Sequence, residues 1–251
     1  MMPWGARGRR FGIDGGARRR VIAAAVPLSR PTTRPLPTRI RSVLFDLDGT
    51  LIDHFATLYA CYRHAFETLG LPVPSPEHVR RSVGGSMEVT MRKLIPEQHV
   101  AAAAALWREH LARIFLDDVT LMPGAADLVR VLHARGLKLA VFTNKIGETS
   151  RALCAHLGLA PDLDLVLGAN DSPWRKPQPE FTALALERLG ATAEETVLVG
   201  DSPYDIDAAE AGGLAVLCVT TGTHAAEELR AAGAAHIYPD LRALGAAVFG
   251  V

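Results

Sequence analysis

The sequence has few cysteines and no long apolar segment. Its three cysteines, Cys61, Cys154 and Cys218, lie far apart and form no Cys-x-x-Cys pair. This usage indicates reduced thiols that pack as small apolar residues, as in cytoplasmic proteins, rather than a disulfide framework. No apolar run approaches the roughly 20 residues that a membrane-spanning helix requires. We therefore expect a cytoplasmic protein that does not bind a membrane.

The chain also lacks net charge, but the balance conceals an asymmetry. Residues 1–41 contain ten Arg and one Asp, so this segment carries +9 while the rest of the chain carries −9. An acidic body argues against nucleic-acid binding by the folded part. Rich in Arg, Gly and Pro, with little apolar periodicity, residues 1–41 are predicted to be a disordered basic extension. An upstream start codon, a targeting peptide or a basic tail would each explain it, and we favour a tail that the core does not need.

Strand and helix patterns alternate in the C-terminal half of the chain. From residue 119 to residue 251, short apolar runs end at polar residues and are followed by helical segments. Such repeats predict an α/β fold, a Rossmann-like parallel sheet with helices on both faces. With 251 residues, 49% of them hydrophobic, the chain fits one such core with a smaller inserted module. We assign residues 42–53 and 119–251 to the core.

Residues 54–118 show no strand pattern. Apolar residues recur there at helical spacing, and Gly and Pro divide the segment into predicted helices over 54–69, 75–83, 86–94 and 96–115. Ser75 is predicted to be an N-cap, with Pro76 at the first helical position. A helical module inserted here is expected to form a cap that covers the neighbouring strand ends, rather than a purely structural bundle.

The most informative stretch is residues 42–53, Ser-Val-Leu-Phe-Asp-Leu-Asp-Gly-Thr-Leu-Ile-Asp. An apolar run that stops at two carboxylates indicates a buried parallel strand that reaches the edge of a sheet, although an ordinary polar strand end would look similar. Because side chains alternate along a strand, Asp46 and Asp48 are expected to lie near one another beyond its C-terminal end. Two carboxylates this close stay ionised together only if a cation lies between them.

Other predicted strands end in polar residues that belong at the same edge of the sheet. Thr143 and Asn144 follow one strand, Asp201 and Asp205 follow another, and Lys176 lies in a loop. Carboxylate oxygens suit Mg²⁺, while an ammonium group and a hydroxyl suit the oxygens of a phosphate. The pattern predicts a phosphoryl-transfer site, where catalysis rests on positioning and charge neutralisation.

Four motifs occur in a fixed order along the chain: Asp-Leu-Asp-Gly-Thr-Leu at 46–51, Thr143-Asn144, Lys176-Pro177, and Gly200-Asp201-Ser202-x-x-Asp205. In this order and spacing the sequence resembles the haloacid dehalogenase-like hydrolases, and the helical insertion is similar to the cap of that superfamily. The stretches Leu-Met-Pro-Gly at 121–124 and Leu-Lys-Leu-Ala-Val-Phe-Thr-Asn-Lys at 137–145 are similar to its phosphoglycolate phosphatase branch. The resemblance covers residues 42–251.

The resemblance implies a Mg²⁺-dependent phosphomonoesterase that acts on a small phosphorylated metabolite, with phosphoglycolate favoured. It implies that Asp46 is the nucleophile that forms an aspartyl-phosphate. Asp48 would be the general acid for the leaving group and then the general base for the hydrolytic water. Asp46, the backbone carbonyl of Asp48 and Asp201 would hold Mg²⁺.

The remaining motif residues receive supporting roles from the same resemblance. Thr143 and Lys176 would grip the phosphoryl group, and Asn144 would support it. Asp205 would lie behind them and orient Lys176 or a metal-bound water. Because Ser202 and Asp205 also have the spacing of a capping box, Asp205 is expected to cap the following helix as well.

Two cap positions call for separate interpretations. Related phosphatases often have Ser where this chain has His54, and we expect His54 to cap the first cap helix rather than to touch substrate. Gly84 and Gly85 lie between two predicted cap helices. We expect Gly85 to let backbone N–H groups, or a nearby Arg among Arg80, Arg81 and Arg92, bind a carboxylate on the substrate. In the alternative interpretation, the glycine pair only ends a helix.

Rival activities differ in the residues that they require. A dehalogenase of this superfamily needs no acid two residues after the nucleophile, so Asp48 argues against it. A phosphonate hydrolase needs a cap lysine, and the cap contains only Lys93. A sugar phosphomutase shares all four motifs and is the main alternative. A non-catalytic binding protein on this fold would not need the intact set of acids.

Overall fold

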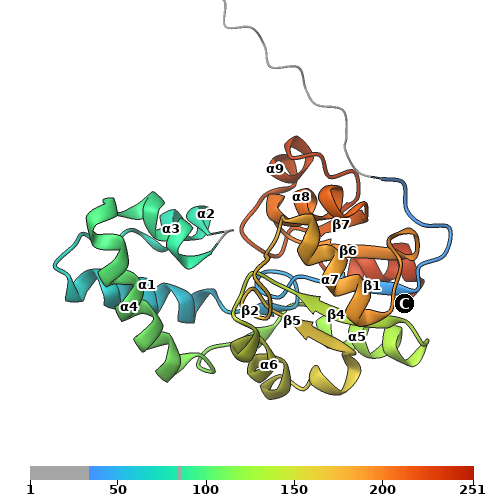
Figure 1. Cartoon of the computed structure of the whole chain (residues 1–251), viewed down its shortest axis with the longest axis horizontal. Coiled ribbons are helices and arrows are strands. Elements are labelled where there is room, and N and C mark those ends of the chain that lie inside the picture. Colours follow the sequence, from blue (N-terminus) through green and yellow to red (C-terminus); the bar gives the residue numbers. More distant parts are fainter. Residues whose placement is uncertain (1–33, 84–85) are drawn as a thin grey trace, which may run out of the picture.

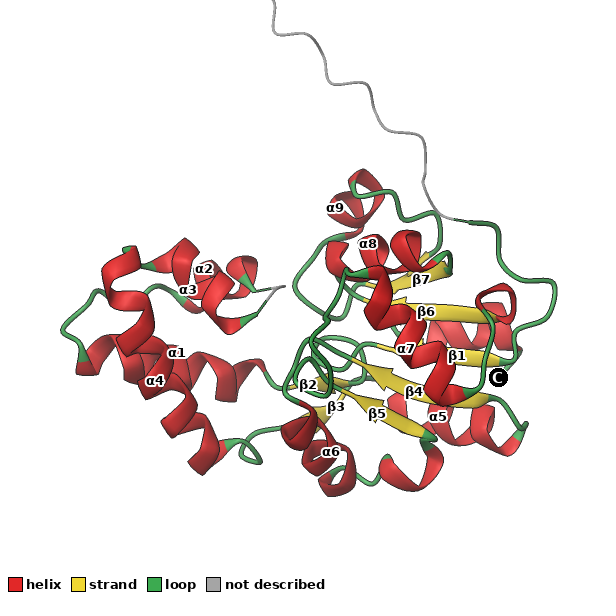
Figure 2. Ribbon diagram, in the orientation of Figure 1, coloured by secondary structure: helices red, strands yellow, loops and turns green. Residues whose placement is uncertain are grey.

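The computed structural model describes residues 34–83 and 86–251. A six-stranded parallel sheet forms the core, with strand order β5-β4-β1-β6-β7-β8 (Figures 1 and 2). This confirms the predicted Rossmann-like class. The strands are β1 (Ser42–Phe45), β4 (Lys138–Phe142), β5 (Leu165–Leu167), β6 (Thr196–Gly200), β7 (Ala215–Val219) and β8 (Ile237–Tyr238).

Helices cover both faces of the sheet, and the side chains of β1, β6 and β7 are therefore all buried. In β1, Val43 and Phe45 pack into one apolar cluster and Leu44 into another on the opposite face. The first cluster includes residues from α5 (Ala125–Ala134), α6 (Gly147–His156) and α10 (Leu241–Leu244). The second includes residues from α7 (Pro179–Leu189), α8 (Pro203–Gly212) and α9 (Ala226–Ala231). Two short 3₁₀ helices, η1 (Ala160–Asp162) and η2 (Ala193–Glu195), and a π-helical segment that continues α10, η3 (Gly245–Phe249), complete the core.

Four helices form a separate body, the cap, beside the C-terminal ends of the strands (Figure 1). They are α1 (Phe55–Thr68), α2 (Pro76–Ser82), α3 (Met87–Leu94) and α4 (Glu97–Ile114). These helices enclose their own apolar cluster, which contains Tyr62, Phe66 and Trp107. The hydroxyl oxygen of Ser75 accepts a hydrogen bond from the His78 N–H, so Ser75 caps α2 as predicted.

The two connections between core and cap pair with each other, which the sequence did not predict. β2 (Ile52–Asp53) and β3 (Thr120–Leu121) form an antiparallel ladder of two residues each. A ladder this short has no periodic pattern in the sequence. It fixes the point at which the chain leaves the core and the point at which it returns.

Residues 34–41, which we assigned to the disordered extension, lie against the core. Leu36 and Ile40 pack on the apolar cluster beneath the sheet, and the N–H of Arg41 donates to the carbonyl of Glu195 at 2.8 Å. The prediction of disorder is therefore wrong for these eight residues; residues 1–33 lie outside the described part. Within residues 34–83 and 86–251, no helix combines the length and apolarity needed to cross a membrane.

Candidate active site

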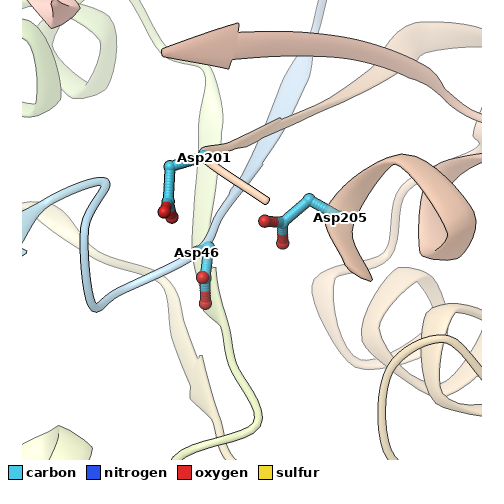
Figure 3. A group of neighbouring side chains, drawn as sticks. All are labelled: Asp46, Asp201 and Asp205. Atoms are coloured by element: carbon cyan, nitrogen blue, oxygen red, sulfur yellow. The ribbon is translucent and has the colours of Figure 1, made fainter. Parts of the chain in front are cut away.

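Three aspartates from different elements meet at the C-terminal edge of the sheet (Figure 3). Asp46 follows β1, Asp201 follows β6, and Asp205 lies in the first turn of α8. The two strands are direct neighbours, with Phe45 paired to Val199, and the Asp46 N–H donates to the Val199 carbonyl at 2.9 Å. The parallel register of β1 and β6 therefore places the first two carboxylates side by side.

Lys176 connects two of these aspartates. Its Nζ lies 2.9 Å from Asp46 Oδ1 and 2.7 Å from Asp205 Oδ1, and its side chain is only 2% exposed. Burial alone would lower the pKa of Lys176, but Asp205 and Asp46 raise it above the ordinary value. Burial raises the pKa of Asp46 to about 6, although the ammonium group of Lys176 opposes this shift. Lys176 is therefore a cation held beside Asp46, and its charge favours the ionised form of that carboxylate.

The loop that carries Lys176 is held by Asn144. The Asn144 side chain donates to the Lys176 carbonyl at 3.1 Å and accepts from the Lys176 N–H at 2.9 Å. Thr143 is 2% exposed and its hydroxyl oxygen accepts from the Lys145 N–H at 3.1 Å. Both residues, which follow β4, thus fix the loops around the acidic cluster, and both line the cavity described below.

Asp205 has the two structural relationships that its position suggested. Its Oδ2 accepts from the Ser202 N–H at 3.1 Å and from the Ser202 hydroxyl at 2.6 Å, and the capping box of α8 is complete. Its Oδ1 faces Lys176. The start of α8 therefore holds Asp205 in place, and Asp205 holds Lys176.

Asp201 lies in a confined space between two glycines. A Cβ atom on Gly49 would lie 2.7 Å from Asp201 Oδ2, and one on Gly222 would lie 1.8 Å from it. Gly49 also has φ of +86°, a conformation that side-chain-bearing residues rarely adopt. The Asp201 carboxylate accepts hydrogen bonds from the Thr50 hydroxyl at 3.1 Å and the Thr223 N–H at 3.4 Å. Burial and the nearby carboxylates of Asp205 and Asp46 raise its pKa well above the ordinary value.

The acidic cluster has the chemistry of a Mg²⁺ site. Oxygen atoms of Asp46, Asp201 and Asp205 all lie within 4.8 Å of one another. Buried carboxylates that repel one another raise each other's pKa, and a divalent cation among them would remove that penalty. Hard oxygen ligands of this kind fit Mg²⁺.

The expectation that a cation lies between Asp46 and Asp48 stays a prediction. Within the described residues, the carboxylates grouped closely enough to share an ion are those of Asp46, Asp201 and Asp205, and the group does not include the side chain of Asp48. Asp48 has a lysine of its own: Lys145 Nζ lies 3.1 Å from Asp48 Oδ1 and 3.0 Å from Oδ2. Burial would raise the pKa of Asp48, but Lys145 holds it below the ordinary range. We missed Lys145, although it directly follows Thr143-Asn144 in the sequence.

His54 occupies the N-cap position of α1, as predicted, and its carbonyl accepts from the Leu58 N–H at 3.1 Å, but its side chain does not cap the helix. Its side chain makes no cap hydrogen bond, and the Phe55 N–H is instead bound by Asp53 Oδ1 at 3.0 Å. The His54 ring is buried and lies between the Phe115 carbonyl, 2.9 Å from Nε2, and Lys145 Nζ, 3.0 Å from Nδ1. His54 therefore connects both core–cap linkers with the surroundings of Asp48.

A cavity of about 360 Å³ lies between the acidic edge of the core and the cap. The volume is near the lower end of the range of roughly 300–1,000 Å³ that is typical of small-molecule sites. Its core wall includes Asp46, Asp48, Thr143, Asn144, Lys176 and Asp201, while Asp205 lies behind Lys176. Apolar side chains make up much of its cap wall: Phe55, Leu58, Tyr62, Val83, Met87, Trp107 and Leu111.

Two cap arginines line this cavity. Arg108 is paired with Glu88, and Arg80 lies over the Phe55 ring, with Cζ 3.8 Å from the ring centroid. Arg81 and Arg92 are exposed, and each forms an ion pair: Arg81 with Glu77, and Arg92 with Glu97. Gly84 and Gly85, predicted to help bind substrate, lie outside the described residues. Of the three arginines considered from the sequence, only Arg80 lines the cavity.

Comparison with known proteins identifies the family. The family model described as haloacid dehalogenase-like hydrolase matches residues 43–219. The chain belongs to this family. It is 35% identical over 195 residues to "Phosphoglycolate phosphatase" of Chromobacterium violaceum, covering 73% of this chain and 86% of that protein. It is 33% identical over 196 residues to "Probable phosphatase IndB" of Dickeya dadantii, covering 76% of this chain and 85% of that protein.

Solved structures agree with this assignment at the level of the fold. A hydrolase of the haloacid dehalogenase-like family from Streptococcus pneumoniae superposes with a TM-score of 0.75 at 24% identity, covering 82% of this chain and 97% of that one. The prediction that this haloacid dehalogenase-like protein is an enzyme of the phosphatase class is confirmed by its family and relatives.

Proposed function

We propose that the protein is a Mg²⁺-dependent phosphomonoesterase that acts on a small phosphorylated metabolite through an aspartyl-phosphate. The observation that carries this proposal is the position of Asp46, at the wall of the cavity, between the Lys176 cation and the Asp201 carboxylate. A buried carboxylate held in this way is a fixed nucleophile, and the neighbouring charges offset the charge of the phosphoryl oxygens.

In the first step, an Asp46 oxygen attacks phosphorus and the bond to the ester oxygen breaks. Lys145 favours the ionised form of Asp48 in the free protein, so Asp48 first takes up a proton, which the negative charge of the bound ester favours. It then gives this proton to the departing alkoxide, so that an alcohol leaves. In the second step, Asp48 takes a proton from water, which attacks phosphorus, and the bond to Asp46 breaks to release inorganic phosphate. Mg²⁺, held by Asp46, Asp201 and the backbone carbonyl of Asp48, would supply charge neutralisation to both steps.

Lys176 and Thr143 are the groups that we assign to the phosphoryl oxygens. Lys176 is already within 2.9 Å of the nucleophile, and the Thr143 hydroxyl lies at the end of the adjacent strand β4. Asn144 and Asp205 contribute indirectly, because one holds the backbone of Lys176 and the other its ammonium group. These two contacts limit the movement of the Lys176 ammonium group while the phosphoryl group is transferred.

Phosphoglycolate is the substrate that we favour. Relatives named phosphoglycolate phosphatase support this choice, as does Arg80, a cap cation that could bind a carboxylate at the far side of the cavity. The apolar cap residues favour testing larger esters as well, since a two-carbon acid makes little use of them. A cytoplasmic location remains a prediction, in line with three buried free cysteines.

A substrate screen with phosphate detection tests the proposal. Phosphoglycolate, sugar phosphates, nucleotides and 4-nitrophenyl phosphate would each be incubated with the protein, with Mg²⁺ or with excess chelator. We expect release of inorganic phosphate with Mg²⁺ only, and none from Asp46→Asn. Phosphate moved within a sugar, rather than released, would favour the phosphomutase. No turnover of any ester would overturn the proposal.

A further inference from the structure

We propose that Lys145 and His54 are positioning residues for Asp48, and that they orient its carboxylate for proton transfer to the leaving group. The inference rests on the proposed function, because it assigns a role within that reaction. It names two residues that the four motifs do not include. The geometry that carries it is a chain of contacts from the cap hinge, through His54 and Lys145, to Asp48.

The ammonium group of Lys145 has three protons and three acceptors. Asp48 Oδ1, Asp48 Oδ2 and His54 Nδ1 lie 3.1, 3.0 and 3.0 Å from Nζ. Its side chain is 9% exposed. Lys145 therefore connects both Asp48 oxygens with His54, at a position on the wall of the cavity.

The contacts of His54 determine which of its nitrogens carries the proton. The Phe115 carbonyl can only accept, so Nε2 donates to it at 2.9 Å. An ammonium group can only donate, so Nδ1 accepts from Lys145. His54 Nδ1 therefore does not donate to Asp48, from which it lies 3.6 Å away. Instead it supports the lysine that holds both Asp48 oxygens.

The backbone fixes this arrangement at both ends. The Lys145 N–H donates to the Thr143 hydroxyl at 3.1 Å, and the Lys145 carbonyl accepts from the Ala169 N–H at 3.0 Å. His54 immediately follows β2, and Phe115 follows α4. The imidazole ring of His54 therefore bridges the linker that leaves the core and the linker that returns to it. A change in the angle between cap and core would move the ring and, with it, the support of Lys145.

Proton donation matters in proportion to the basicity of the leaving group, which provides a test. The value of kcat/KM for formation of the phosphoryl-enzyme would be measured with an alkyl ester that the wild type hydrolyses, such as phosphoglycolate, and with 4-nitrophenyl phosphate. An alkoxide needs the proton, whereas 4-nitrophenolate leaves without it. We expect Lys145→Met to lower kcat/KM roughly 10²-fold for the alkyl ester and only a few-fold for the aryl ester.

Two further variants and a binding measurement serve as controls. Lys138→Met removes a lysine at the N-terminal end of β4, where its ammonium group binds the Gly190 carbonyl. This variant should not change kcat/KM for either ester. His54→Gln, which retains Lys145, should show a smaller loss with the same preference for the alkyl ester. Binding of the alkyl ester would also be measured by calorimetry in Asp46→Asn, with and without Lys145→Met, and should be the same.

The outcomes separate this inference from the proposed function. Equal losses with both esters, no loss with either, or weaker binding that accounts for the whole loss would each overturn the positioning role. If the wild type releases phosphate from no ester, or Asp46→Asn retains activity, it is the proposed function that fails.

Discussion

The core wall and the cap wall of the cavity are built in different ways. On the core wall, charged side chains follow strands β1, β4 and β6, and they bind one another in two clusters centred on Lys176 and Lys145. On the cap wall, apolar side chains from helices surround two arginines, and Arg80 contacts an aromatic ring instead of a carboxylate. We infer that the core wall performs a reaction common to all substrates, while the cap wall selects among them.

This difference follows from how each wall is supported. A parallel sheet fixes the ends of its strands to one another through the register of its hydrogen bonds, so neighbouring carboxylates cannot move apart. The cap has its own apolar cluster and is joined to the core by two linkers. Its side chains can therefore differ in position without disturbing the catalytic groups.

The largest expected effect concerns the core wall. Asp201→Asn removes a charged ligand from the proposed metal site, so kcat/KM should fall by at least roughly 10²-fold for every substrate. Stabilisation by Mg²⁺, measured as the rise in Tm on adding the ion, should also disappear. Asp207→Asn, at an exposed position of α8, is the matched control. A loss confined to one substrate would contradict the division between the walls.

A smaller and selective effect is expected on the cap wall. Arg80→Gln removes the cation that we assign to a substrate carboxylate, so KM for phosphoglycolate should rise roughly 10-fold or more, as for a lost charge-assisted hydrogen bond. KM for an ester without a carboxylate should stay the same. The neighbouring Arg81→Gln, exposed and paired with Glu77, should affect neither substrate. Equal changes for both esters would remove Arg80 from substrate selection.

A pH-dependent effect on stability should mark the core wall in the metal-free protein. Burial raises the folded-state pKa of Asp46 from 3.8 to about 6, so the folded state holds this proton more tightly than the unfolded state does. Its contribution to stability is complete below about pH 4 and is lost as the pH rises through about 6. Relative to Asp46→Asn, the free energy of unfolding should fall by at most about 3 kcal/mol across this range.

Urea unfolding of the two metal-free proteins at several pH values measures this difference. Both would be prepared with chelator, because bound Mg²⁺ would displace the proton. A difference that stays constant between pH 4 and pH 7 would show that Asp46 keeps its ordinary pKa.

The smallest effect concerns the N-terminal segment. Deletion of residues 1–33 should leave Tm and kcat unchanged, because the composition offers too little apolar surface to offset the entropy of ordering it. Deletion of residues 1–40 also removes Leu36 and Ile40 from the core, and should cost about 1–3 kcal/mol of unfolding free energy. Equal stability of the two truncated proteins would mean that residues 34–40 contribute nothing.

Much of the core wall was predictable because it depends on local patterns. Apolar runs that end in Asp46 and Asp201 specify both the strands and the edge at which they stop. The Lys145–His54 contact was not predictable in this way, since it joins residues 91 positions apart through the linkers of the cap. Nor could the sequence choose Arg80 over Arg81, because that choice depends on how α2 faces the core.

The central claim is that Asp46 carries the phosphoryl group, and intact-protein mass spectrometry after rapid acid quenching tests it most directly. During turnover of 4-nitrophenyl phosphate with Mg²⁺, the wild type should gain the mass of one phosphoryl group, and fragmentation should place it on Asp46. Asp46→Asn should gain none. A phosphoryl group on another residue, or its retention in Asp46→Asn, would contradict the assignment.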